Sequence, residues 1–90
     1  MPSFLIETYL ARCTDVERAA REHQAHSAAA EATQTGARVS FDGSIHVPED
    51  ELCFFVFAAP TAEQAAEVAR HAGLEPLRVV EAVPSRKENQ

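Results

Sequence analysis

The segment 44–60 restricts the possible folds more than any other part of the 90-residue chain. Residues 44–47 favour a strand, and the acidic run 48–51 predicts a turn. Residues 52–59 are then apolar except for Cys53. Because both faces of that run are apolar, it predicts a central strand that is covered on both sides.

The remaining elements surround this hairpin in a regular order. Strands are predicted at 4–10, 37–47 and 77–83, with a bulge at Asp42-Gly43 in the second of them. Two helices are predicted, each opening on a capping box, at Thr14-x-x-Glu17 and Thr61-x-x-Gln64.

The resulting order, β-α-β-β-α-β, is that of the split βαβ motif. Right-handed crossovers then give an α+β, ferredoxin-like fold, with an antiparallel four-stranded sheet of order 4-1-3-2 and both helices on one face. We expect a single domain over 1–84 and a flexible polar tail over 85–90.

Alternation along the strands predicts which side chains meet the helices. In the first strand, Phe4, Ile6, Thr8 and Leu10 share the more apolar face, which we expect to meet the helices. The first helix should bury a stripe at helical spacing. That stripe consists of Val16, Ala19, Ala20, His23, Ser27 and Ala30.

The opposite face of the sheet is predicted to be open and apolar. The side chains expected there are Leu5, Tyr9, Cys53, Phe55 and Phe57. Such a face is too apolar to remain exposed to water, so we expect a homodimer in which two sheets stack face to face.

Charge and composition exclude several classes of function. A net charge of −6 opposes binding to nucleic acid, because phosphate contacts need a basic face. There is no long apolar run that would span a membrane and no basic start of a signal peptide, so a cytoplasmic protein is expected. Two cysteines, Cys13 and Cys53, form no disulfide framework. They can meet at one end of the sheet or lie apart as separate thiols.

Glu7 is the most conspicuous single candidate for a functional residue. It lies in the middle of a central strand among apolar neighbours, where a carboxylate must be paired, protonated or metal-bound. Glu81 is near the middle of the neighbouring last strand, so the two carboxylates can share a proton or a cation. The alternative is a salt bridge from Glu7 to Arg38 or Arg78, or a carboxylate at a solvated edge of the sheet.

Histidines supply further candidates for a metal site. His23 and His26 are three residues apart on the first helix, so one metal ion can contact both imidazoles. The alternative is two surface histidines, or a His23 hydrogen-bonded in the core. His46 ends the second strand beside the acidic turn, and His71 lies in the last turn of the second helix, where its charge suits the helix dipole.

Several segments resemble a family of small actinobacterial proteins grouped as a domain of unknown function, one branch of which is described as nickel-binding. The resemblance implies a ferredoxin-like fold, a dimer and nickel binding. Glu7, Cys53 and Glu81 match the family pattern, whereas relatives commonly carry an aromatic residue in place of His46. The matching segments are 4–7, 44–54, 57–63, 72–74 and 78–83.

We therefore expect a small dimeric protein that binds a divalent metal, nickel for preference, and no organic cofactor. The candidate ligands are Glu7, His23, His26, His46 and Glu81. The alternative is a small-molecule binder or a cofactor-free enzyme of the monooxygenase, isomerase or cyclase type.

In that alternative the cavity lies beside the sheet. Tyr9, Phe55 and Phe57 form its walls, and Glu7 or His23 is the general acid or base. A third possibility is a structural or regulatory dimer without chemistry. The sequence does not decide whether the protein is an enzyme.

Overall fold

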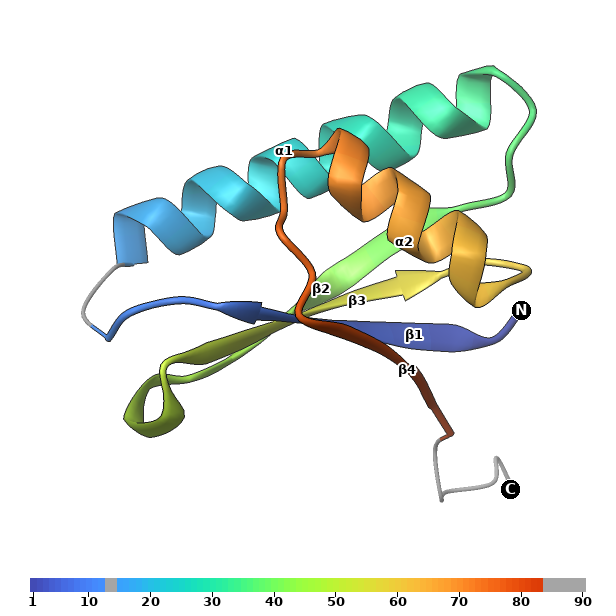
Figure 1. Cartoon of the computed structure of the whole chain (residues 1–90). Coiled ribbons are helices and arrows are strands. Elements are labelled where there is room, and N and C mark those ends of the chain that lie inside the picture. The colour runs from blue at the N-terminus through green and yellow to red at the C-terminus, as the bar shows by residue number, and fades with distance from the viewer. Residues whose placement is uncertain (13–14, 84–90) are drawn as a thin grey trace, which may run out of the picture.

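The computed structural model describes residues 1–12 and 15–83 of the chain. It confirms the predicted order of elements and the ferredoxin-like fold (Figure 1). The sheet has the order β2-β3-β1-β4 with every neighbouring pair antiparallel. The elements are β1 (Ser3–Tyr9), α1 (Asp15–Gln34), β2 (Ser40–Val47), the short 3₁₀ helix η1 (Pro48–Asp50), β3 (Leu52–Ala58), α2 (Ala62–His71) and β4 (Arg78–Ala82).

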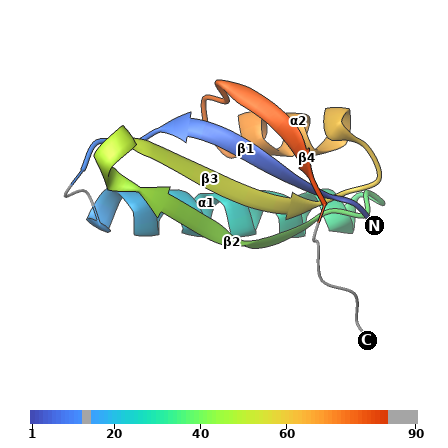
Figure 2. The same cartoon turned by 90° about the horizontal axis from the view of Figure 1, so that it is seen from below.

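Both helices cover the same face of the sheet. α1 lies along the side formed by β2 and β3, and α2 lies over β1 and β4 (Figure 2). The other face of the sheet is uncovered in the single chain. Among the described residues, neither helix combines the length and the apolarity that crossing a bilayer requires.

The predicted bulge in β2 is present. The register between β2 and β3 shifts between Phe41 and Gly43, where Gly43 adopts a φ of 133°, a backbone conformation that favours glycine. Because the bulge absorbs Asp42, the parity of the strand changes. Ser44 and His46 therefore face the helices, as Phe41 does before the bulge.

The face predicted for β1 is confirmed, but the one predicted for β3 is wrong. Phe4, Ile6, Thr8 and Leu10 are buried beneath the helices as expected. Cys53, Phe55 and Phe57 are buried there too, because the register pairs Thr8 with Cys53, Ile6 with Phe55 and Phe4 with Phe57. The residues of β3 on the open face are Leu52, Phe54, Val56 and Ala58.

The stripe predicted for α1 is also wrong. The buried residues are Ala25, Ala28 and Ala29, whereas Val16 is 85% exposed. The alanines of α1 occur on several sides of the helix, so a contrast between apolar and polar residues did not mark its inner side. Toward the helix start, the inner side continues through Arg18, Arg21 and Glu22, which are half-buried.

The ends of α2 follow the predicted local signals. The Thr61 side chain accepts a hydrogen bond from the Gln64 backbone N–H at 3.1 Å, as an N-cap does. Gly73 follows the helix with a φ of 87°. The corresponding box at Thr14, the proposed approach of Cys13 to Cys53, and the tail 85–90 lie outside the described residues.

Candidate functional site

Polar side chains gather between the first half of α1 and the sheet. Three strands contribute them: Thr8 comes from β1, Ser44 and His46 from β2, and Cys53 from β3. Cys53 is in register with Thr8 on one side and His46 on the other, so these side chains point to the same face of the sheet. The bulge at Gly43 places Ser44 and His46 in this group.

Helix α1 covers the group with charged residues at helical spacing. Arg18, Arg21 and Glu22 repeat at intervals of three and four residues, so they lie on the side of α1 that faces the sheet. The Ser44 hydroxyl donates a hydrogen bond to the Glu22 carboxylate. We refer to Ser44, His46, Cys53 and Glu22 as the thiol cluster.

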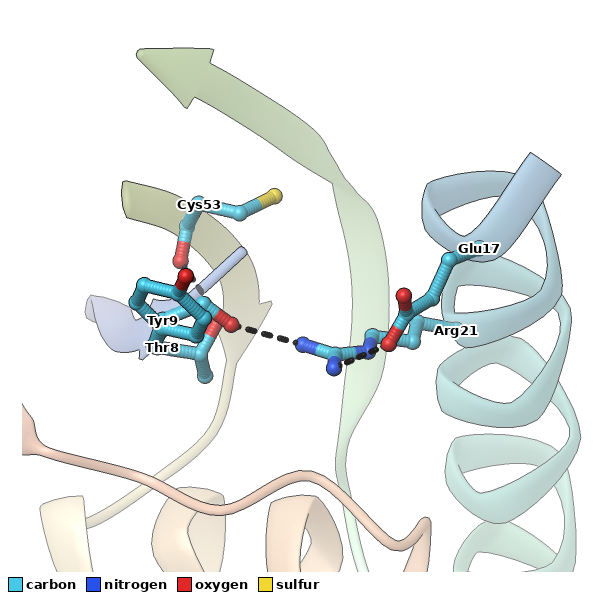
Figure 3. Close-up of polar contacts among 5 residues, drawn as sticks. All are labelled: Thr8, Tyr9, Glu17, Arg21 and Cys53. Carbon is cyan, nitrogen blue, oxygen red and sulfur yellow. Dashed lines mark hydrogen bonds and ion pairs between the residues drawn. The ribbon is translucent and has the colours of Figure 1, made fainter. Parts of the chain in front are cut away.

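Arg21 connects α1 to the end of β1. Its Nη1 donates to the Tyr9 carbonyl oxygen at 3.0 Å, and its Nη2 pairs with the Glu17 carboxylate one turn earlier. Figure 3 shows the guanidinium extending from the helix between these two partners. The arginine is therefore held in place at the edge of the thiol cluster.

Cys53 lies at the centre of the thiol cluster and has no exposed surface. Burial raises the pKa of its thiol, and the Glu22 charge acts in the same direction. The Ser44 hydrogen bond and the charges of Arg18 and Arg21 partly oppose that rise in pKa. The side chain is therefore a neutral thiol at neutral pH. The Cys53 carbonyl accepts a hydrogen bond from the Thr8 hydroxyl at 2.8 Å (Figure 3).

His46 carries a polar atom without a partner. Its Nε2 is buried and has no hydrogen-bond partner within the described part of the chain. A buried polar atom without a partner costs free energy, so such an atom in a native structure calls for an explanation. It lies on the residue that is in register with Cys53.

A cavity of about 310 Å³ opens beside Arg21, and none of the thiol cluster residues lines it. It lies between the end of β1, helix α1 and the loop that joins α2 to β4. Its walls are Thr8, Tyr9, Arg21, Gly73, Glu75, Pro76 and Leu77.

The predicted approach of Glu7 to Glu81 is wrong. Glu7 is in register with Arg78 and faces the open side, where Arg78 Nε donates to Glu7 Oε1 at 3.1 Å. Glu81 is in register with Phe4, whose side chain faces the helices. Glu81 is three positions after Arg78 in the strand, so the side chains of Arg78 and Glu81 point to opposite faces; Glu7 and Glu81 therefore lie on opposite faces of the sheet.

The two histidines of α1 also lie apart. Both are exposed, and they line different cavities: His23 faces one beside His71, and His26 faces one beside Phe41 of β2. Among the residues the structure describes, no three His, Cys, Asp or Glu side chains are grouped closely enough to hold a metal ion. His71 instead pairs with Glu31 of α1 at 3.5 Å.

The predicted cavity walls are only partly retained. Phe55 and Phe57 pack against the Phe41 ring in the core, with ring centroids 6.2 and 5.3 Å from it. Tyr9 is exposed, lines the cavity beside Arg21, and donates a hydrogen bond from its hydroxyl to Glu51 at 3.4 Å.

Sequence reasoning missed the contributions of Ser44, Arg21 and Glu22. The signals for them were present, since the bulge at Gly43 reverses the parity of β2. The spacing of Arg18, Arg21 and Glu22 also continues that of the buried alanines of α1.

Comparison with known proteins supports the fold. No protein-family model and no curated protein sequence matches the chain. Among solved structures, the chain is similar to SCO4226 from Streptomyces coelicolor A3(2), with a TM-score of 0.68 and 22% sequence identity over 93% of this chain and 99% of that one. At this identity the similarity shows a shared fold.

Proposed function

We propose that the protein binds a divalent metal, nickel for preference, at His46 and Cys53. The observation that carries this proposal is the buried His46 Nε2, which has no partner among the described residues and belongs to the residue in register with Cys53. Imidazole and thiolate are donors that suit nickel and zinc. The resemblance to a family with a nickel-binding branch extends to Cys53 but not to His46, so it supports the metal only through the thiol.

Burial opposes the loss of the Cys53 proton, so metal binding itself has to drive that loss. A metal binds the thiolate, so the thiol proton must leave. Ser44, which donates its hydroxyl proton to Glu22, lies beside Cys53 and partly opposes the rise in the pKa of the thiol. The charges of Arg18 and Arg21 lower the free energy of the thiolate.

This proposal narrows the set of ligands expected from the sequence. Glu7 is paired with Arg78, and His23 and His26 line separate cavities, so we retain His46 and add Cys53. Glu22 supplies the carboxylate of the thiol cluster, and it accepts a hydrogen bond from Ser44. A movement of its side chain toward the metal, together with water, would complete the coordination.

Cobalt(II) is the spectroscopic probe for this site. Titration of untagged protein with Co(II) is expected to produce a thiolate-to-cobalt charge-transfer band, and Ni(II) added afterwards should displace the cobalt. In isothermal titration with Ni(II), His46→Ala and Cys53→Ser should each weaken binding at least tenfold. His26→Ala is the matched control, because it removes an exposed imidazole outside the thiol cluster and should leave the affinity unchanged. Equal nickel affinities for the wild type and His46→Ala would refute the proposal.

We also propose that the protein is a homodimer that pairs the open faces of two sheets. Each of the four strands contributes apolar side chains to this face, which also carries the Glu7–Arg78 pair; the apolar residues include Leu5, Ile45, Phe54, Val56 and Val80. Ile45 is 54% exposed in the single chain, and stacking two such faces removes apolar surface from water.

We propose the cytoplasm as the location of the protein, since reducing conditions keep Cys53 as a free thiol.

Sedimentation equilibrium tests the dimer directly. The wild type should have twice the 9.8 kDa mass of one chain, and Val56→Glu should sediment as a monomer. Val16→Glu is the matched control, because Val16 is exposed on α1 rather than on the open face. A wild type of 9.8 kDa at high micromolar concentration would exclude the dimer.

A further inference from the structure

We propose that the cavity beside Arg21 binds a small zwitterion, such as a free α-amino acid with an apolar side chain. The cavity is separate from the metal site proposed above, because none of the thiol cluster residues lines it. Among the described residues that line it, the charged side chains are those of Arg21 and Glu75.

Arg21 provides the contact for the carboxylate of such a ligand. The guanidinium has five N–H donors, and the bonds to Tyr9 and Glu17 leave others available. Those two bonds also hold the arginine in a defined orientation at the cavity wall. An arginine fixed in this way is suited to binding a carboxylate through paired hydrogen bonds.

Glu75 provides the contact for an ammonium group. It forms no ion pair or hydrogen bond with any other described residue, although it lines the cavity that Arg21 also lines. A ligand with only a carboxylate would leave Glu75 without a partner, and a ligand with only an ammonium group would leave the remaining N–H donors of Arg21 unused. A zwitterion satisfies both, and charge complementarity of this kind gives specificity.

The loop between α2 and β4 holds its side of the cavity in shape. The Leu74 N–H donates to Ala69 O at 3.0 Å, and the Leu77 N–H donates to Glu7 O at 2.7 Å. A pocket that is already formed avoids the free-energy cost of ordering a loop when the ligand binds.

The size and the apolar surface of the cavity indicate the rest of the ligand. A volume of about 310 Å³ accommodates a small molecule rather than a peptide. Pro76 and Leu77 line the cavity together with Tyr9, and Leu77 is largely exposed. An apolar ligand side chain of moderate size would cover this surface.

The test compares free amino acids with derivatives that lack one charge. Leucine, valine, methionine and phenylalanine are titrated into ¹⁵N-labelled protein together with their N-acetyl and amide forms. The free amino acids should shift the amide signals of residues 73–75 and of Leu77 in a saturable way. The N-acetyl and amide forms should each bind at least tenfold more weakly. The absence of saturable shifts at 10 mM free amino acid, or equal binding of all three forms, would overturn the proposal.

A pair of glutamate variants assigns the ammonium contact. Glu75→Gln should weaken binding of the free amino acid about tenfold and remove its preference over the N-acetyl form. Glu67→Gln changes an exposed glutamate on α2 outside this cavity. It should change neither the affinity for the free amino acid nor the preference for that form over the N-acetyl form. Equal effects of the two variants would contradict the role of Glu75. Nickel binding at His46 and Cys53 should be the same in both, so failure here is distinguishable from failure of the metal site.

Discussion

Glu7 on β1 and Arg78 on β4 face each other across the open side of the sheet, with Arg78 Nε 3.1 Å from Glu7 Oε1. The Glu7 side chain is only 17% exposed, whereas that of Arg78 is 68% exposed. The carboxylate that seemed to require an explanation in the sequence is thus paired by its neighbour in register. It needs no metal to be satisfied.

Removing the Arg78 side chain should lower the stability of the protein only modestly. Arg78→Ala is expected to lower the free energy of unfolding by about 1 kcal/mol or less, because the partner of Glu7 is mostly exposed and screened by water. Urea denaturation at low and high salt measures this, and the loss should shrink at high salt. Arg38→Ala is the control, since Arg38 was the other partner expected for Glu7. A larger loss for Arg38→Ala would contradict the observed pairing.

Two adjacent phenylalanines test the orientation of β3. Phe55→Ala should destabilise the protein by about 3–5 kcal/mol, since it leaves a cavity in the core. Phe54→Ala, on the open face, should cost clearly less in the monomer, and its effect should depend on protein concentration if that face is a dimer interface. Thermal and urea unfolding at several concentrations measure both. The reverse order of destabilisation would restore the orientation first expected from the sequence.

Cys53 makes stability depend on pH in the alkaline range. An unfolded cysteine loses its proton near pH 8.5, but burial raises the pKa of Cys53 in the folded protein. Between those two pKa values the folded state binds more protons than the unfolded state, so stability falls as pH rises, by at most about 1.4 kcal/mol per pH unit. Below the unfolded pKa, Cys53 contributes no pH dependence.

Urea denaturation from pH 7 to 10 checks this expectation. The comparison is with Cys53→Ala, in which the same titration by other groups remains and the contribution of Cys53 is absent. The difference in unfolding free energy between the two proteins should narrow steadily above the unfolded pKa. A constant difference over the whole range would mean that the Cys53 pKa is not raised.

The cap of α2 gives a local test of the fold. Thr61→Ala should cost about 1 kcal/mol, because the Gln64 N–H loses its hydrogen-bond acceptor at the helix start. Thr61→Ser is the control, since it keeps the hydroxyl and should remain close to the wild type in thermal unfolding. An equal loss in both variants would show that Thr61 acts through its methyl group rather than its oxygen.

The contrast between β1 and β3 shows how far strand patterns can be interpreted. In β1, Glu7 interrupts one face, so alternation identified Phe4, Ile6 and Thr8 as the inner set, and the structure confirms this. β3 is apolar on both faces, so its sequence carries no information about which set faces the helices. The register with β1 decides that question.

Helix α1 shows the same limit for helical patterns. Alanine occurs on several sides of this helix, and charged residues lie on its inner side near the start. A pattern search therefore selected Val16 and His23, which are exposed. Arg21 and Glu22 can lie on the inner side because both form hydrogen bonds there. Arg21 donates to Tyr9 O, and Glu22 accepts from the Ser44 hydroxyl.

The sequence alone determined the order of the elements, the bulge at Gly43, the cap at Thr61 and the ferredoxin-like fold. These features depend on local signals, such as capping residues, turn residues and strand alternation, which act between residues close together in the chain. Tertiary structure alone decided that Cys53 lies opposite His46 beneath Arg21 and Glu22, and that Glu7 meets Arg78 rather than Glu81. Those pairings depend on strand register and helix rotation, which are set by packing between distant segments.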